Sequence, residues 1–107
     1  MLVQIVNFNL TEMTDEEFLQ MADEVAPAFA AVPGLLSKVW LRDVASNTYG
    51  GVYSWRDEAS QSAYAASDLC QAVITNPHFA NLTSRTFGVI DAPTSVTRGS
   101  ITAAISR

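Results

Sequence analysis

The sequence predicts an α+β fold in which two helices cover one face of a four-stranded antiparallel sheet. Three observations predict it. Strand-like and helix-like segments follow one another in the order β-α-β-β-α-β. The length of 107 residues suits one domain of the commonest size, and a hydrophobic content of 49% is enough for one core. We therefore expect a single domain over residues 1–107, with residues 92–107 as a C-terminal arm.

The first predicted strand is Leu2–Asn9, a short segment rich in β-branched residues. A helix follows it, because Thr14 and Glu17 have the spacing of a capping box. Apolar residues recur every three or four positions on one face of this helix, at Phe18, Ala22, Val25 and Phe29. The helix is expected to end near Ala31, because proline and glycine follow at positions 33 and 34.

The second and third strands are predicted at Leu35–Asp43 and Tyr49–Trp55, with a short loop between them. Gly50-Gly51 in the third strand indicates either a bulge or the close approach of another group. Asp57 is placed to cap a second helix that runs to about Ser67.

Residues Asp68–Thr75 either continue the second helix or form a separate short one, and Asn76-Pro77 ends it. The fourth strand is predicted at Asn81–Asp91. Small and polar residues follow from Ala92, which is typical of an arm or tail. The complete order of elements is that of ferredoxin-like folds.

Apolar residues occupy both faces of the predicted sheet. In the first strand, Val3 and Ile5 point to the face opposite Val6 and Phe8. A sheet that carries helices on one side only would have a polar outer face if it stood alone. We therefore expect a homodimer in which the two sheets pack against each other.

Composition excludes several classes of partner. The formal net charge is −5, and six basic residues are scattered among eleven acidic ones, so neither nucleic acid nor an anionic membrane is expected to bind. One histidine and one cysteine cannot form a zinc site within the chain, and no cofactor-binding motif is present. No targeting segment is visible and the lone Cys70 suits a reducing compartment, so we expect a cytoplasmic protein.

A longer pattern resembles a known family. Pro33-Gly34-Leu35-Leu36-Ser37-Lys38-Val39-Trp40, followed by Gly50-Gly51-Val52-Tyr53, resembles the signature of the YdhR-like monooxygenases. These proteins belong to the dimeric α+β barrel superfamily and are akin to the antibiotic-biosynthesis monooxygenases. The agreement continues through Trp55-Arg56-Asp57-Glu58, Ala63-Tyr64 and Phe87-Gly88-Val89, so the resemblance covers residues 33–93.

The resemblance implies a dimeric barrel with a hydrophobic cavity between the helices and the sheet of each subunit. It also implies oxygenation of a small aromatic substrate by O₂ without metal, haem or flavin. Such a reaction needs a substrate that can itself give an electron to O₂, such as a phenol, an anthrone or a polyketide-like compound. The protein must then supply a flat apolar slot, a group that favours the deprotonated substrate, and exclusion of bulk water.

Three aromatic residues are candidates for the substrate-binding slot: Trp40, Tyr53 and Trp55. Aromatic rings pack against planar ligands, and the indole N–H or the phenol O–H gives a polar anchor. The alternative interpretation places these three residues in the core or at the dimer interface.

Three polar residues are the catalytic candidates: His78, Arg85 and Asn7. His78 is the only side chain that ordinarily titrates near neutrality, which suits a general base, although it can equally lie in a surface loop. Arg85 can stabilise a phenolate or pair with an acid across the dimer. Asn7 lies on a strand that should be buried, where its amide needs a partner such as a substrate oxygen or bound O₂. For Lys38, the sole lysine, a surface or interface role is expected rather than a Schiff base.

The function that we expect is cofactor-independent monooxygenation of a small aromatic compound. Two alternatives remain. One is a haem-binding or haem-degrading dimeric barrel, for which His78 is the only strong iron ligand. The other is a non-enzymatic dimer that binds a small apolar ligand.

Overall fold

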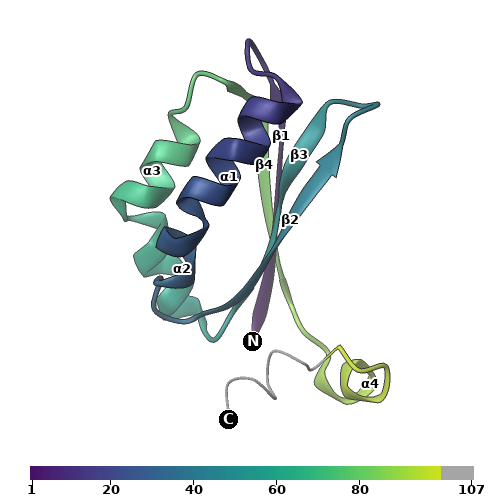
Figure 1. The fold of residues 1–107 in the computed structure, drawn as a ribbon. Coiled ribbons are helices and arrows are strands. Elements are labelled where there is room, and N and C mark those ends of the chain that lie inside the picture. Colours follow the sequence, from purple (N-terminus) through teal and green to yellow (C-terminus); the bar gives the residue numbers. More distant parts are fainter. Residues whose placement is uncertain (100–107) are drawn as a thin grey trace.

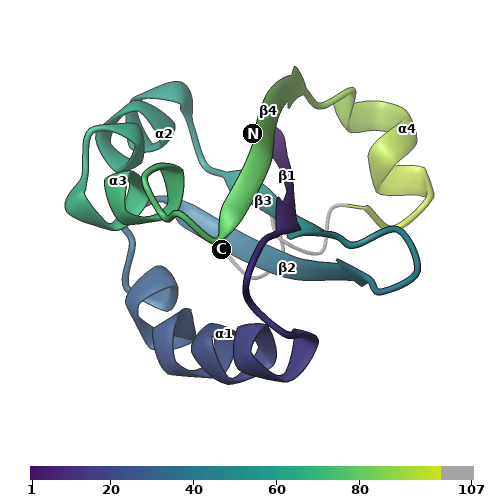
Figure 2. The same cartoon turned by 90° about the horizontal axis from the view of Figure 1, so that it is seen from above.

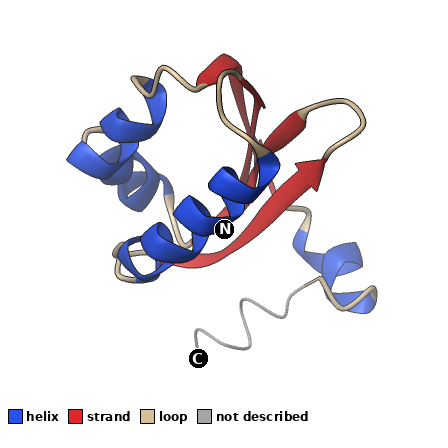
Figure 3. Cartoon of the chain, turned by 45° about the horizontal axis from the view of Figure 1, so that its top comes forward, coloured by secondary structure: helices blue, strands red, loops and turns tan. Residues whose placement is uncertain are grey.

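The computed structural model describes residues 1–99 and confirms the ferredoxin-like α+β fold (Figure 1). The elements are β1 (Leu2–Leu10), α1 (Asp15–Ala30), β2 (Leu35–Asp43), β3 (Thr48–Trp55), α2 (Glu58–Ala65), α3 (Asp68–Ile74), β4 (Phe79–Gly88) and α4 (Asp91–Val96). The four strands form one sheet in the order β2-β3-β1-β4, and all neighbours are antiparallel. Helices α1, α2 and α3 lie on one face of this sheet (Figure 3).

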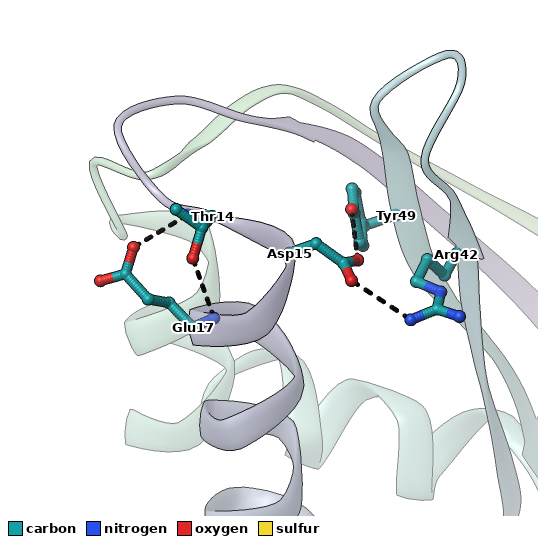
Figure 4. A network of polar contacts seen from close by, with 5 residues as sticks. All are labelled: Thr14, Asp15, Glu17, Arg42 and Tyr49. Carbon is teal, nitrogen blue, oxygen red and sulfur yellow. Dashed lines mark hydrogen bonds and ion pairs between the residues drawn. The ribbon is translucent and has the colours of Figure 1, made fainter.

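Side-chain caps fix where the helices begin. The Thr14 hydroxyl accepts a hydrogen bond from the Glu17 backbone N–H at 3.1 Å, and the Glu17 carboxylate accepts one from the Thr14 N–H at 2.9 Å (Figure 4). This is the predicted capping box. Asp57 caps α2, as expected. The Ser67 hydroxyl caps α3, so α2 and α3 are two separate helices.

The start of α1 is tied to the sheet by a small polar network. The Tyr49 hydroxyl donates a hydrogen bond of 2.7 Å to the Asp15 carboxylate, and Arg42 lies 3.3 Å from its other oxygen (Figure 4). Tyr49 is on β3 and Arg42 on β2, so Asp15 holds the first turn of α1 over these two strands. The hydrogen bond to Asp15 raises the pKa of Tyr49, because it stabilises the protonated phenol.

The C-terminal part of the chain differs from the prediction. Strand β4 begins at Phe79 rather than Asn81, because Phe79 pairs with Leu10 of β1 and stacks on Phe8 at a centroid distance of 4.1 Å. It ends at Gly88, and the short helix α4 follows, where the strand had been expected to continue to Asp91. This helix lies beyond the end of β4, away from the other three helices (Figures 1 and 2). The part of the predicted arm after residue 99 lies outside the described residues.

The two faces of the sheet are both apolar, as the alternation predicted. The inner face supplies most of the buried core: Val6, Phe8, Tyr49, Tyr53 and Trp55, joined by Phe18 and Phe29 of α1, Tyr64 of α2 and Cys70 of α3. On the outer face, Val3 pairs with Phe87, while Val52 pairs with both Ile5 and Val39. Val39 and Phe87 remain 56% and 41% exposed in the single subunit.

Gly50 marks a close approach of two strands rather than a bulge. Its φ of +154° lies in a region that residues with side chains rarely adopt, and a Cβ there would lie 1.8 Å from the carbonyl oxygen of Val6 on β1. The pairing of β1 with β3 stays regular across this position. The backbones of the two central strands therefore meet at a site that only glycine fits.

Gly50→Ala is expected to lower the free energy of unfolding by about 2–4 kcal/mol, because the new methyl group collides with backbone that cannot move aside. Urea denaturation followed by circular dichroism measures the change. Gly88→Ala is the matched control, since a Cβ at Gly88 meets nothing within 4 Å. Equal stability of the two variants would contradict the steric explanation.

Candidate functional site

A small cavity lies between the helices and the inner face of the sheet. Its volume is about 40 Å³, and its walls come from α1, α3 and all four strands. Six aromatic side chains border it: Phe8, Phe18, Phe29, Trp40, Tyr53 and Phe79. Over the sheet, α1 stands apart from the α2–α3 pair (Figure 2). The cavity that the family resemblance implied is therefore present.

Lys38 is the one charged side chain that borders this cavity among the described residues. Its Nζ lies 3.4 Å from the ring centroid of Phe29, 3.5 Å from that of Trp40 and 4.7 Å from that of Tyr53. Within residues 1–99 the Lys38 side chain forms no hydrogen bond and no ion pair. The surface role expected for Lys38 is therefore wrong, and a role at a subunit interface stays a prediction. Its strand parity, shared with Trp40, places it inside.

Two opposing effects act on the Lys38 ammonium. Burial lowers the pKa of Lys38 to about 7, because the charged form loses hydration. The faces of Phe29, Trp40 and Tyr53 attract the cation and partly offset this loss. The amine can consequently exchange a proton near neutral pH, as a general base must.

Tyr53 and Trp55 occupy successive inward positions on β3 but differ in what they reach. Tyr53 borders the cavity, and burial raises its pKa to about 12, so its hydroxyl stays protonated. Trp55 is fully buried behind it, stacked on Tyr53 at 6.1 Å, and its Nε1–H donates to the Gln4 side-chain oxygen at 2.9 Å. Trp40 and Tyr53 thus contact the cavity directly, while Trp55 supports the Tyr53 ring.

Two wider recesses adjoin the cavity along α1 and β2. One of about 320 Å³ is bordered by Phe29, Lys38 and Trp40, together with Ala26, Ala30 and Leu35–Ser37. The other, of about 350 Å³, lies against α1 and also reaches Trp40. Trp40 therefore borders the cavity and both recesses, and Lys38 borders the cavity and the first recess.

The largest recess, of about 470 Å³, lies between the end of α1 and α2. Arg56 borders this recess, and its guanidinium contacts Asp57 at 3.2 Å and the Ser60 hydroxyl at 3.3 Å. Lys38 does not border this recess. The largest recess therefore has no charged group without a partner that would correspond to the Lys38 amine of the cavity.

The structure places the three predicted catalytic residues away from the cavity. The His78 Nδ1 lies 2.9 Å from the carbonyl oxygen of Thr11, in the turn before β4. Asn7 and Arg85 are on the outer face of the sheet, where Arg85 lies opposite Ile5 and its guanidinium stands 5.1 Å from the Phe87 ring centroid. The expectation that His78 or Arg85 lies at the polar end of the cavity is thus wrong for the single subunit, because strand parity and the β4 turn direct them elsewhere. Whether they act in catalysis stays a prediction.

Sequence reasoning missed Lys38, Phe29 and Gly51 as cavity residues. The signal for Lys38 was its parity, since residues two apart on a strand share a face and Trp40 was already assigned inward. Phe29 was recognised as part of an inward helix face but not as a wall of the site. Nothing in the local sequence indicates that the end of α1 comes within 5.5 Å of the Trp40 ring.

Few other sites compete with this one. In the described part of the chain, no group of three or more His, Cys, Asp or Glu side chains could hold a metal ion. No helix within residues 1–99 is long and apolar enough to cross a membrane. A haem in the cavity would have no histidine beside it, since His78 contacts Thr11 instead.

Solved structures of similar fold include proteins with oxygenase names, a heme-degrader and a protein of unknown function. A putative antibiotic biosynthesis monooxygenase from Deinococcus radiodurans is 14% identical, with a TM-score of 0.72 over 86% of this chain and 95% of that one. SnoaB, a cofactor-independent oxygenase from Streptomyces nogalater, is 19% identical, with a TM-score of 0.68 over 85% and 94%. The heme-degrader MhuD from Mycobacterium tuberculosis is 22% identical, with a TM-score of 0.68 over 84% and 96%.

At these identities the structural likeness shows the fold alone, and no curated protein matches the sequence. The family is shown by the sequence itself. The chain belongs to the family described as "Putative mono-oxygenase ydhR", which matches over residues 2–100.

The free energy of unfolding is expected to rise as the pH is raised from about 7 to 9. The folded pKa of Lys38 is lowered from 10.5 to about 7, so in this window the unfolded chain binds a proton that the folded chain has released. Stability therefore increases by up to about 1.4 kcal/mol for each pH unit. Above this window the raised pKa values of Tyr53 and Cys70 act in the opposite direction.

Urea denaturation at pH 7, 8 and 9 measures this effect, and Lys38→Met should remove the rise. A pH slope that is the same in wild type and variant would show that Lys38 stays protonated in the folded protein. Because the chain has a single lysine, ¹⁵N labelling of its side chain gives an independent reading of the pKa.

Proposed function

We propose that the protein is a cofactor-independent monooxygenase of a small aromatic compound that carries an ionisable hydroxyl group. The observation that carries this proposal is the Lys38 amine, which has no acidic partner among residues 1–99 and lies among the aromatic walls of the cavity. Family membership supports the reaction class. The site supplies an apolar slot with one basic group, which is what the chemistry of a self-oxidising substrate requires.

The size of each space assigns the two reactants to different places. A cavity of about 150 Å³ is known to accept benzene, and about 10–15 Å³ is enough for one water. The cavity of about 40 Å³ is therefore too small for an aromatic ring. The recess of about 320 Å³ between α1 and β2 is large enough, and Lys38 borders it. The substrate ring lies in this recess, against Trp40, with its hydroxyl group directed to Lys38.

Lys38 then acts first as a base and afterwards as a counter-ion. The neutral amine takes the proton of the substrate hydroxyl, which leaves an electron-rich anion beside an ammonium. The three ring faces stabilise that ammonium, and in an environment with little water its attraction for the anion is strong. For an anthrone, O₂ accepts four electrons from the ring methylene: one oxygen atom becomes the new carbonyl and the other leaves as water.

Lys38→Met is expected to lower kcat by about 10²–10³, by analogy with the removal of one oxyanion-stabilising group. Oxygen uptake with an anthrone or a dihydroxynaphthalene as probe measures the rate. Lys38→Arg keeps the charge but not a base that titrates near neutrality, so it should recover only part of the rate. Trp40→Ala should mainly raise KM, by about 10- to 100-fold, because a stacked ring contributes about 1–3 kcal/mol.

The same assay decides between the residues. His78→Ala and Arg85→Ala belong in it, because the sequence predicted catalytic roles for both. Activity that is lost in either variant and kept in Lys38→Met would contradict the role of Lys38. If wild type consumes no oxygen with any probe but binds the probes in the recess, the protein is a binding module and the enzymatic proposal is wrong.

We also propose that the active form is a homodimer that packs the outer faces of two sheets together. The exposed apolar residues Val39 and Phe87 support it, together with Val3, Ile5 and Val52 between them. Burial of such a face removes apolar area from water at about 25 cal/mol per Å². This contact lies on the side of the sheet opposite the cavity, so each subunit keeps its own site.

Light scattering is expected to give twice the chain mass of 11.6 kDa at micromolar concentration. Val39→Glu should convert the protein to monomers, because it places a charge on the apolar outer face. Val44→Glu is the control, since Val44 is equally exposed in the turn between β2 and β3. A wild type that stays monomeric would refute the dimer.

A further inference from the structure

Gly51 is glycine for a different reason from Gly50. Its backbone is not in the left-handed region, so its conformation does not require glycine. A Cβ at this position would instead lie 3.0 Å from Lys38 Cε and 3.4 Å from Tyr53 Cε1, on the border of the cavity. A side chain at this position would therefore press against the Lys38 stem and the Val39 carbonyl oxygen at the border of the cavity.

The cavity that Gly51 borders suits a small apolar molecule. Its volume is about 40 Å³, several times what one water needs but about a quarter of what benzene needs. Phe8, Phe18 and Val25 are among its walls, and such apolar cavities stay dry and take up uncharged gases. Among the described residues that border it, most side chains are apolar, so the cavity gives a buried water few polar partners.

The cavity also has a cation at one end and the proposed substrate position next to it. Lys38 borders both this cavity and the recess of about 320 Å³ between α1 and β2. Phe29, Lys38 and Trp40 border both spaces. These three residues therefore form the wall between a molecule in the cavity and a ring in the recess. A fixed positive charge here stabilises negative charge that forms in the cavity.

We propose that this cavity is the dioxygen-binding site of the subunit, with Gly51 keeping it open and Lys38 as the positioning charge. The inference rests on the proposed oxygenase function. Once Lys38 has taken the substrate proton, the substrate anion gives one electron to O₂ in the cavity. The anion becomes a radical and O₂ becomes superoxide, which the Lys38 ammonium stabilises. No bond forms or breaks in this step, and recombination of the two radicals then forms the first C–O bond.

Xenon is the probe for the cavity, because it is apolar and of a size comparable to O₂. Crystals of the wild-type protein under xenon pressure should show one site bordered by Gly51, Lys38 and Tyr53. Gly51→Ala should abolish that site, because its methyl group occupies the space. Gly88→Ala is the matched control, since a Cβ there meets nothing within 4 Å. Val25→Leu fills the same cavity from α1 and serves if Gly51→Ala does not fold.

Oxygen kinetics test the assignment to O₂. Gly51→Ala should raise the KM for O₂ by at least about tenfold, and by more than it raises the KM for the aromatic probe, because its methyl group narrows the cavity and also contacts Lys38; Gly88→Ala should change neither. Absence of xenon from the wild-type cavity, or an unchanged KM for O₂ in Gly51→Ala, overturns the inference. Xenon in the cavity without oxygen uptake by the wild type overturns instead the proposed function, so the two failures are distinguishable.

Discussion

The contact between the Lys38 amine and three aromatic rings is the constraint on which the site depends. Each ring comes from a different part of the fold: Phe29 from α1, Trp40 from β2 and Tyr53 from β3. An amine with no acidic partner keeps its charge in such a place only with help from ring faces, and it releases its proton readily. The lowered pKa of Lys38 therefore depends on how α1 packs on the sheet.

The position of α1 is itself fixed at both ends. At its start, the capping box and the contacts of Asp15 with Tyr49 and Arg42 hold the first turn over β2 and β3. At its end, Phe29 is buried against Trp40 at a centroid distance of 5.5 Å and against Tyr53 at 6.2 Å. Between these anchors, Met21 and Val25 of α1 border the cavity.

Two neighbouring glycines of β3 have different structural roles. Gly50 lets the backbones of β1 and β3 approach, while Gly51 omits a side chain that would enter the cavity. Similar structures that carry the names of oxygenases and of a heme-degrader show that this fold accommodates different chemistries. Among the described residues of this chain, the cavity lining carries one amine.

Local sequence determined the order of elements, the capping of α1 by Thr14, and the two apolar faces of the sheet, because these depend on near neighbours and on periodicity alone. It also selected Trp40 and Tyr53, which do border the cavity.

The position of Lys38 was predicted wrongly because an isolated lysine is ordinarily solvated. Its place on the inner face of β2 depends on the packing of Phe29, which comes from a helix distant in the sequence. The β4 boundary moved because Phe79 stacks on Phe8, a partner more than sixty residues away. His78 and Arg85 were assigned by chemical type, but where they point depends on the β4 turn and on strand register. Tertiary structure decided which side chains share the cavity, since that is set by contacts between residues that sequence spacing does not relate.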